Sequence, residues 1–238
     1  MCGRSSLTKT EKEIEARFNA TFYSDELERY NPLPNFNVAP TQRMPVITSG
    51  DAKHIRIFKW GLIPSWAKDK NIGSKLINAR VETLQEKTMF KSLLQSKRCI
   101  IPLDGFYEWK RSGKEKIPFR IKTTNQDIFA CAGLHDSWID PVSNELIETF
   151  TIITVGPNKL MEEIHNRMPA ILGQSSEKDW LDPEIKTQDA LQLLIPYPPE
   201  EMEAYQVSDK VNSVRINDKS LIEAYIPPSK PQQISLFD

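Results

Sequence analysis

The sequence predicts an α+β fold in a single domain. Residues 99–155 are dense in strand patterns, and helix patterns lie on both sides of them. Strands and helices do not alternate regularly, which argues against a parallel α/β sheet. The chain has 238 residues, and neither an internal repeat nor a shift in composition interrupts it before residue 226. We therefore expect one domain over residues 1–226 and a proline-rich tail over residues 227–238.

The helix predictions rest on capping signals and on the spacing of apolar residues. The first helix is expected over residues 8–22, because Thr10 and Glu13 fit a capping box. Ile14 and Phe18 then lie four residues apart on one face. The other helix patterns begin at the capping pair Thr83 and Glu86, begin at Pro157, and cover residues 176–181 and 188–195.

Strands are indicated by β-branched and aromatic runs that turn residues separate. One hairpin is expected around residues 49–51 and another around residues 112–114. The four prolines of residues 30–45 predict an irregular segment instead. The expected strands cover residues 46–48, 54–60, 106–110, 117–122, 128–134 and 150–155.

Charge is balanced over the whole chain but not along it. Lys and Arg number 31 and Asp and Glu number 32, so the net charge of −1 provides no global attraction to nucleic acid or membrane. Residues 51–122 nevertheless hold seventeen Lys or Arg and only seven Asp or Glu. This excess predicts a basic working face and a polyanionic partner. The alternative is that the cations are scattered over solvent-facing strands.

The cysteine pattern excludes a disulfide framework. Cys2, Cys99 and Cys131 are odd in number and no CxxC spacing occurs, so we also expect no metal site. With 9 Gly against 17 Pro, a glycine-rich nucleotide-binding loop is not expected either. The sequence lacks the apolar runs of a signal peptide or a membrane span. We expect a cytoplasmic protein that needs no cofactor.

Cys2 carries the most informative chemistry. Methionine aminopeptidase removes Met1 when the next side chain is small, so the mature chain would begin with Cys2. Its amine and thiol, with reference pKa values of about 8 and about 8.5, are each partly deprotonated near neutrality, and Arg4 would favour the thiolate. Such a 1,2-aminothiol captures an aldehyde as a Schiff base and then closes a thiazolidine ring, or it attacks an amide. The alternative is that Cys2 merely follows Met1.

Five other residues could support proton transfer or binding. Glu108 lies among aromatic residues, where burial would raise its pKa, although a strand Glu more often faces solvent. His165 ends an expected helix, and it either shuttles protons or complements the helix dipole. Asn78 and Arg80 share a face if their segment is a strand. Asn78 would then orient a reactive group and Arg80 would bind a phosphate. The alternative is a polar strand edge. Trp66, in an expected loop, could stack on a base, whereas most other aromatics of this region are assigned to the core.

A series of short motifs runs in order from residue 2 to about residue 226. They are Met1-Cys2-Gly3-Arg4, Asn37-Val38-Ala39-Pro40-Thr41, Trp60-Gly61-Leu62-Ile63-Pro64, Asn78-Ala79-Arg80-Val81-Glu82-Thr83, Arg98-Cys99-Ile100-Ile101-Pro102, Asp104-Gly105-Phe106-Tyr107-Glu108-Trp109, Ala132-Gly133-Leu134, Thr151-Ile152-Ile153-Thr154 and Ile164-His165-Asn166-Arg167-Met168-Pro169. As an ordered set they resemble the SOS response-associated peptidase (SRAP) family, also described as abasic site processing proteins.

The resemblance implies a fold and a function. The fold is a compact α+β domain around a β-barrel-like core of mixed strands flanked by helices. The function is recognition of abasic sites in single-stranded DNA and a covalent thiazolidine link through Cys2, which protects the lesion in the DNA damage response. The link would be self-reversing, and Met1 would be removed by autoproteolysis or an aminopeptidase. The protein would be a nucleoid-associated monomer that does not bind membranes.

The resemblance also implies residue roles. Cys2 would be the nucleophile, Asn78 would orient its amine or the opened deoxyribose, and Glu108 would be the general acid and base. His165 would assist proton transfer to the ring oxygen and reversal of the link. The DNA-binding residues implied are Gly3, Arg4, Asn37, Pro40, Trp66, Arg80, Thr154 and Arg167, with the arginines on phosphates. Family members often carry two adjacent aromatics where this chain has Ser65-Trp66, so one stacking platform is missing.

Two other function classes stay open. One is a thiol peptidase that acts on proteins, although the motifs account for only one peptide bond, that after Met1. The other is a non-catalytic adaptor for single-stranded DNA or for a sliding clamp. A blocked N-terminus would abolish crosslinking and spare the adaptor function.

The tail ends in a second recognisable peptide. Gln233-Ile234-Ser235-Leu236-Phe237 is similar to the pentapeptide by which bacterial replication and repair proteins dock on the sliding clamp. Gln233 would hydrogen-bond at the mouth of a groove, while Leu236 and Phe237 would fill its apolar pocket. The prolines before it would act as a stiff spacer. The alternative is a tail that folds back on its own domain.

We expect the sliding clamp of the same organism to bind the full-length chain and not a chain truncated after Pro228, because the truncation removes the apolar anchors. Calorimetric titration measures both affinities. Equal binding by the two chains, or binding by neither, would contradict docking through the tail.

Overall fold

The structure, a computed structural model, describes residues 3–226. Cys2 and the tail residues Gln233, Leu236 and Phe237 therefore lie outside the described residues. The strands are β1 (Ser5–Leu7), β2 (Thr21–Phe22), β3 (Asn35–Val38), β4 (Arg43–Thr48), β5 (Asp51–Trp60), β6 (Asn78–Arg80), β7 (Arg98–Leu103), β8 (Gly105–Ser112), β9 (Glu115–Thr123), β10 (Phe129–Ile139), β11 (Leu146–Val155), β12 (Met168–Pro169), β13 (Ile171–Leu172) and β14 (Met202–Gln206). The helices are α1 (Glu11–Phe18), α2 (Ser24–Tyr30), α3 (Thr88–Ser96), α4 (Lys159–Glu162), α5 (Gln174–Leu181) and α6 (Thr187–Gln192).

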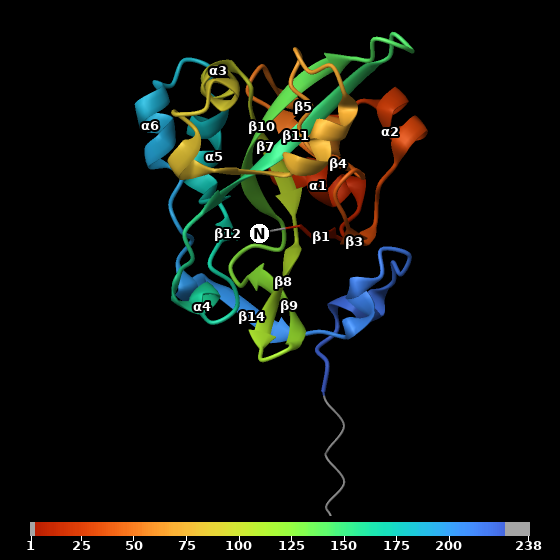
Figure 1. Ribbon diagram of the computed structural model, residues 1–238, viewed down its shortest axis with the longest axis vertical. Helices are drawn as coiled ribbons and strands as arrows, with labels where there is room; N and C mark the ends of the chain where they lie inside the picture. The colour runs from red at the N-terminus through yellow and green to blue at the C-terminus, as the bar shows by residue number, and fades with distance from the viewer. Residues whose placement is uncertain (1–2, 227–238) are drawn as a thin grey trace, which may run out of the picture.

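A closed five-stranded barrel forms the core of the fold. Strands β11, β10, β7, β4 and β5 pair antiparallel in that order, and a parallel pairing of β5 with β11 closes the ring. Figure 1 shows α3, α5 and α6 on one side of the barrel and α1 and α2 on the other. The predicted α+β class and the barrel-like core of mixed strands are confirmed.

A second, antiparallel sheet lies at the lower end of the barrel in Figure 1. Its strand order is β14-β9-β8-β1-β3. Asp104 alone separates β7 from β8, so the chain passes directly from the barrel into this sheet. The β8–β9 hairpin closes with Ser112 opposite Glu115, at the turn that the sequence predicts. Within residues 3–226, every helix is too short or too polar to cross a lipid bilayer.

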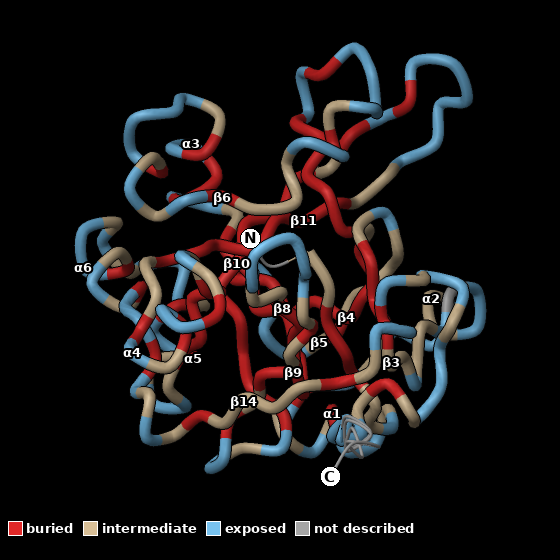
Figure 2. The backbone as a smooth tube through the Cα atoms, turned by 60° about the horizontal axis from the view of Figure 1, so that its bottom comes forward, coloured by how far each residue is buried: buried red, intermediate tan, exposed pale blue. Residues whose placement is uncertain are grey.

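Figure 2 shows long runs of buried residues along the barrel strands. Strand β7 is buried at every position, which explains its continuous apolar run. Gly133 of β10 permits the close packing of its neighbours. A Cβ atom there would lie 2.7 Å from the backbone oxygen of Thr151 and 2.3 Å from the side chain of Ile101. Any larger residue would force the strands apart.

The first expected helix is shorter than predicted. The capping box of Thr10 and Glu13 is present, but α1 ends at Phe18 because Asn19 adopts a left-handed conformation with φ 49°. The chain then forms β2 and the helix α2, both of which sequence reasoning missed. Their few apolar residues give neither a clear strand nor a clear helix pattern.

The expected irregular segment at residues 30–45 is wrong, because it contains β3 and the start of β4. Pro45 lies inside β4, opposite Ile57 of β5. A proline is tolerated there because the pairing of β4 with β7 begins only at Ile47, so the missing N–H removes no bond on that side.

The second capping box is also wrong. Thr83 ends a short 3-10 turn, η2 (Val81–Thr83), and its hydroxyl donates to the carbonyl of Arg80. Helix α3 begins at Thr88 after Lys87, which makes no side-chain cap bond. Asn158 caps α4, where the sequence placed Pro157 at the start of the helix.

Candidate functional site

Glu108 lies in the middle of β8 and is only 2% exposed. A solvent-facing strand position, the more common case for Glu, does not apply here. The side chain lines a pocket of about 260 Å³. The described residues that line this pocket are Glu108, Trp109, Arg111, Lys116, His165 and Asn212.

His165 faces Glu108 across this pocket. It follows α4, where its backbone N–H donates to Met161, and its Nε2 lies 3.9 Å from Oε2 of Glu108. The N–H of Arg167 donates to Nδ1 of His165 at 3.1 Å. Nδ1 also lies 3.3 Å from the Arg167 carbonyl, so the Arg167 backbone holds the ring with Nε2 toward the carboxyl group.

Burial moves the two groups toward their neutral forms. It raises the pKa of Glu108 above its ordinary value and lowers the pKa of His165. A carboxyl that holds its proton more tightly therefore faces an imidazole that releases its proton more easily. Such a pair can exchange protons with a bound substrate near neutral pH.

The first described residues run along Glu108's own strand. β1 pairs antiparallel with β8, with Ser5 opposite Phe106, and the N–H of Tyr107 donates to the carbonyl of Arg4 at 2.9 Å. The next position in this register pairs Gly3 with Glu108. Gly3 is the first described residue, so the register directs this end of the described chain toward the pocket.

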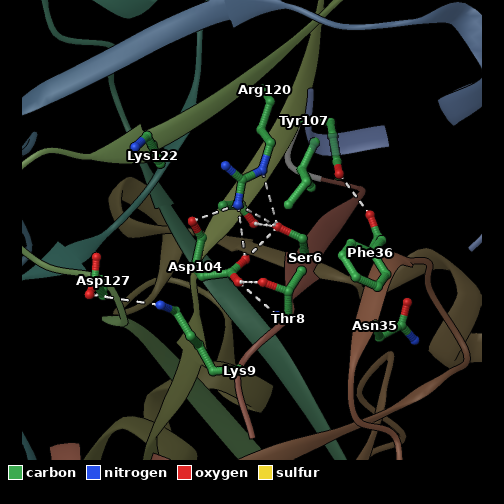
Figure 3. A network of polar contacts seen from close by, with 12 residues as sticks. Ser6, Thr8, Lys9, Asn35, Phe36, Asp104, Tyr107, Arg120, Lys122 and Asp127 are labelled. Atoms are coloured by element: carbon green, nitrogen blue, oxygen red, sulfur yellow. Dashed lines mark hydrogen bonds and ion pairs between the residues drawn. The ribbon is translucent and has the colours of Figure 1, made fainter. Parts of the chain in front are cut away.

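A buried polar network holds β1 in place (Figure 3). Asp104 accepts hydrogen bonds from the Ser6 hydroxyl at 2.6 Å and from the Thr8 backbone at 2.7 Å. Arg120 of β9 lies 3.1 Å from the same carboxylate and also donates to Ser6. Tyr107 donates from its hydroxyl to Phe36 at 2.7 Å, which ties β8 to β3. These contacts fix the register of β1 because each partner is buried or half-buried.

Arg4 and Asn37 act together. The Arg4 guanidinium donates to Oδ1 of Asn37 at 2.6 Å and to the carbonyl of Val211. Asn37 is 1% exposed, and its amide donates to the carbonyls of Ser213 and Ile216. The resemblance implies that Asn37 lines the DNA path, and in the structure its hydrogen bonds orient Arg4 and the 211–216 segment.

The other implied residues gather where β6 and β12 flank β11. Asn78 and Arg80 lie in β6, and Arg80 is exposed opposite the buried Thr154. This confirms that the segment is a strand with both side chains on one face. Both terminal nitrogens of Arg167 donate hydrogen bonds to the Glu82 carboxylate, at 2.6 and 3.0 Å, and one of them also donates to the Thr154 carbonyl. Through Arg167, His165 is coupled to this edge of the barrel.

Two implied residues lie outside this cluster. Trp66 is 65% exposed on a loop that the β10–β11 hairpin supports, since Asp136 accepts the N–H of Ser65 at 2.8 Å. Pro40 is half-buried between β3 and β4. Trp60, Phe106 and Tyr107 are buried, as assigned from sequence.

Sequence reasoning missed four pocket residues. Trp109, Arg111, Lys116 and Asn212 line the pocket with Glu108. Trp109 donates its Nε1–H to Asn212 at 2.8 Å, a contact between residues 103 positions apart. The excess of cations in residues 51–122 was the one signal that pointed to Arg111 and Lys116.

Fold and site together define a class of protein: an α+β barrel whose first strand pairs with the strand that carries the buried Glu108, which faces His165. The chain matches the family described as SOS response associated peptidase (SRAP) over residues 1–214. The protein therefore belongs to the SRAP family, as the ordered motifs indicated.

Relatives and solved structures agree with this assignment. The chain is 50% identical over 228 residues to the abasic site processing protein YoqW of Bacillus subtilis, covering 94% of this chain and 100% of that protein. It is 33% identical to the abasic site processing protein HMCES of Xenopus tropicalis, covering 97% of this chain and 80% of that one. A crystal structure of a Bacteroides thetaiotaomicron protein is 34% identical, with a TM-score of 0.87 and coverage of 94% and 100%.

We expect Glu108→Gln to raise the free energy of unfolding near neutral pH. Burial raises the native pKa above the unfolded value, so the wild type loses stability as the pH rises through the native pKa. The loss is about 1.4 kcal/mol for each unit between the two pKa values, and an amide avoids it because it does not ionise. Denaturant unfolding at about pH 4 and about pH 8 should show an advantage for the variant that is larger at the higher pH. The exposed Glu115→Gln is the control, and an advantage independent of pH would contradict the assignment.

Proposed function

We propose that the protein recognises abasic sites in single-stranded DNA and links to them covalently through Cys2 once Met1 is removed. The observation that supports this proposal is the register of β1 on β8, because its continuation brings Gly3, the residue after Cys2, to Glu108. The names of the relatives point to the same lesion. DNA as substrate also fits the excess of cations in residues 51–122.

The proposed chemistry begins with the opened deoxyribose, which presents an aldehyde. The amine of Cys2 adds to the carbonyl carbon, and the carbinolamine then loses water to give an imine. The thiol sulfur next adds to the imine carbon, and its proton is transferred to nitrogen, which closes the thiazolidine. One water molecule is released overall, and no oxidant or reductant is needed.

The buried pair supplies the proton transfers. A protonated Glu108 can donate to the departing hydroxyl, and its carboxylate can then take the proton of the thiol. His165 would protonate the sugar ring oxygen during ring opening, and the same groups run in reverse would release the link. Asn78 would orient the amine or the opened sugar.

The strand itself would be held by cations and by stacking. Arg80 is exposed and accessible to a phosphate, and Arg4 is held by Asn37 at the start of the chain. Arg167 would contact a phosphate from its place beside Glu82, with Thr154 fixing its position. Trp66 would stack on a base, and Gly3 and Pro40 would line the path. We propose this action for a monomer at the nucleoid in the cytoplasm.

A peptidase activity has one specific support, the description of the family. We assign this activity only to the bond between Met1 and Cys2, which is cleaved by the protein itself or by an aminopeptidase. Digestion of other proteins by the purified chain would contradict this restriction.

We expect the purified protein to lack Met1 and to form a durable adduct with abasic single-stranded DNA. Cys2→Ser keeps the amine but cannot close a thiazolidine, so its adduct should be a reversible imine only. Intact mass measurement and denaturing gels report both results. An equally durable adduct with Cys2→Ser would rule out the thiazolidine, and DNA binding without any adduct would favour the adaptor function.

We expect Glu108→Gln and His165→Ala to slow formation or reversal of the link by about 10²–10⁴-fold while DNA affinity changes little, because one positioned acid–base group contributes about that much to a rate. Single-turnover kinetics at saturating DNA measure the effect. Glu115→Gln, at the exposed end of the same sheet, is the matched control. Unchanged kinetics in Glu108→Gln would show that proton transfer runs through other groups.

A further inference from the structure

The β8–β9 hairpin places two cations at the rim of the Glu108 pocket. Arg111 of β8 and Lys116 of β9 lie directly opposite each other in the strand register. Both side chains are exposed, and both line the pocket together with Glu108 and His165. Like charges in directly opposite positions of an antiparallel pair destabilise it. Their arrangement is therefore unfavourable unless an anion lies between them.

Neighbouring cations of the same sheet have acidic partners, whereas these two do not. Lys110 lies 3.5 Å from Glu163, and Lys122 lies 2.9 Å from Glu203. Across residues 3–226, no carboxylate lies within ion-pair distance of Arg111 or Lys116. Two positive charges thus face the pocket, and no described residue forms an ion pair with either of them.

These charges act on the reactive pair. Burial lowers the pKa of His165 first, and the positive charge of Arg111 acts in the same direction. Arg111 is therefore electrostatically coupled to the imidazole that faces Glu108. An anion bound at Arg111 would lie next to the groups that transfer protons.

We propose that Arg111 and Lys116 bind one phosphodiester of the DNA strand, on the hairpin side of the Glu108–His165 pocket. This rests on the proposed function, because the ligand is the strand that carries the lesion. A phosphodiester has one negative charge and two free oxygens. The guanidinium can offer them two parallel N–H donors, and the ammonium adds a compact positive charge.

The site would extend the DNA path from the barrel edge to the second sheet. Arg80 and Arg167 lie on β6 and just before β12, at the barrel edge. Arg111 and Lys116 lie on the β8–β9 hairpin instead, beyond the point where β1 leaves β8. The strand would thus be held on both sides of the reactive pair, which fixes the sugar between two bound phosphates.

The test is the salt dependence of DNA binding. Fluorescence anisotropy with a short single strand, undamaged or with one abasic site, gives the affinity of each variant from low to high salt. Replacing both cations in Arg111→Gln/Lys116→Gln should lower the affinity several-fold at low salt. It should also flatten the slope of log K against log salt by about 0.7 for each phosphate that the variant no longer neutralises. Lys12→Gln/Lys186→Gln removes the same charge from exposed positions outside the pocket and outside residues 51–122, and it should keep the wild-type slope.

A second measurement locates the phosphate. Single methylphosphonates, which lack the charge, are placed one at a time on either side of the lesion. One position should weaken binding to the wild type and have little effect on binding to Arg111→Gln/Lys116→Gln. The proposal would be overturned if Arg111→Gln/Lys116→Gln had the same salt slope as the control pair. It would also be overturned if every methylphosphonate weakened DNA binding to this variant as much as to the wild type. Adduct formation by the wild type tests the proposed function separately. A failure of the phosphate site can therefore be distinguished from a failure of the proposed function.

Discussion

A strand of three residues holds the start of the chain against β8, and the candidate site depends on that pairing. β1 is held through side chains as well as through its backbone, since the hydroxyls of Ser6 and of Thr8, which follows the strand, both donate to Asp104. Asp104 is in turn paired with the buried Arg120. Removing one partner of such a buried pair typically costs about 3–5 kcal/mol, because the other charge is left uncompensated. The register of β1 on β8 is therefore strongly specified, although the strand that carries it is short.

The junction of the two sheets accounts for the chemistry of the site. The chain leaves the barrel at Leu103 and enters the second sheet at Gly105, so β8 begins beneath a closed apolar core. Glu108 lies four residues after Asp104, where solvent is still excluded, and this burial raises its pKa. His165 comes from a separate segment after α4 and meets Glu108 only because β11 and β12 return the chain to the same edge. Desolvation by the fold, rather than any unusual residue type, makes the pair suited to proton transfer.

Charge is distributed so that burial favours the neutral forms of the reactive pair, while cations lie at the rim of its pocket. Two arginines near the site have carboxylate partners: the buried Arg120 pairs with Asp104, and the half-buried Arg167 pairs with Glu82. Arg111 and Lys116 have no such match among the described residues and lie at the pocket rim. A chain with a net charge of only −1 can thus present a local cationic surface to a polyanion without a globally basic composition.

Sequence alone determined the class of fold, the family and the list of reactive residue types, because apolar periodicity, caps and ordered motifs are local signals. The capping box of Thr10, the strand at Asn78 and the β8–β9 hairpin are examples. Tertiary structure decided what is buried and what meets. Pro45 became a strand residue because one side of β4 was free, and Asn37 became a support for Arg4 because the 211–216 segment covers it. Glu108 meets His165, and Arg111 and Lys116 line the same pocket. These contacts depend on the closure of the barrel and on the register of the second sheet. No local sequence pattern encodes such distances.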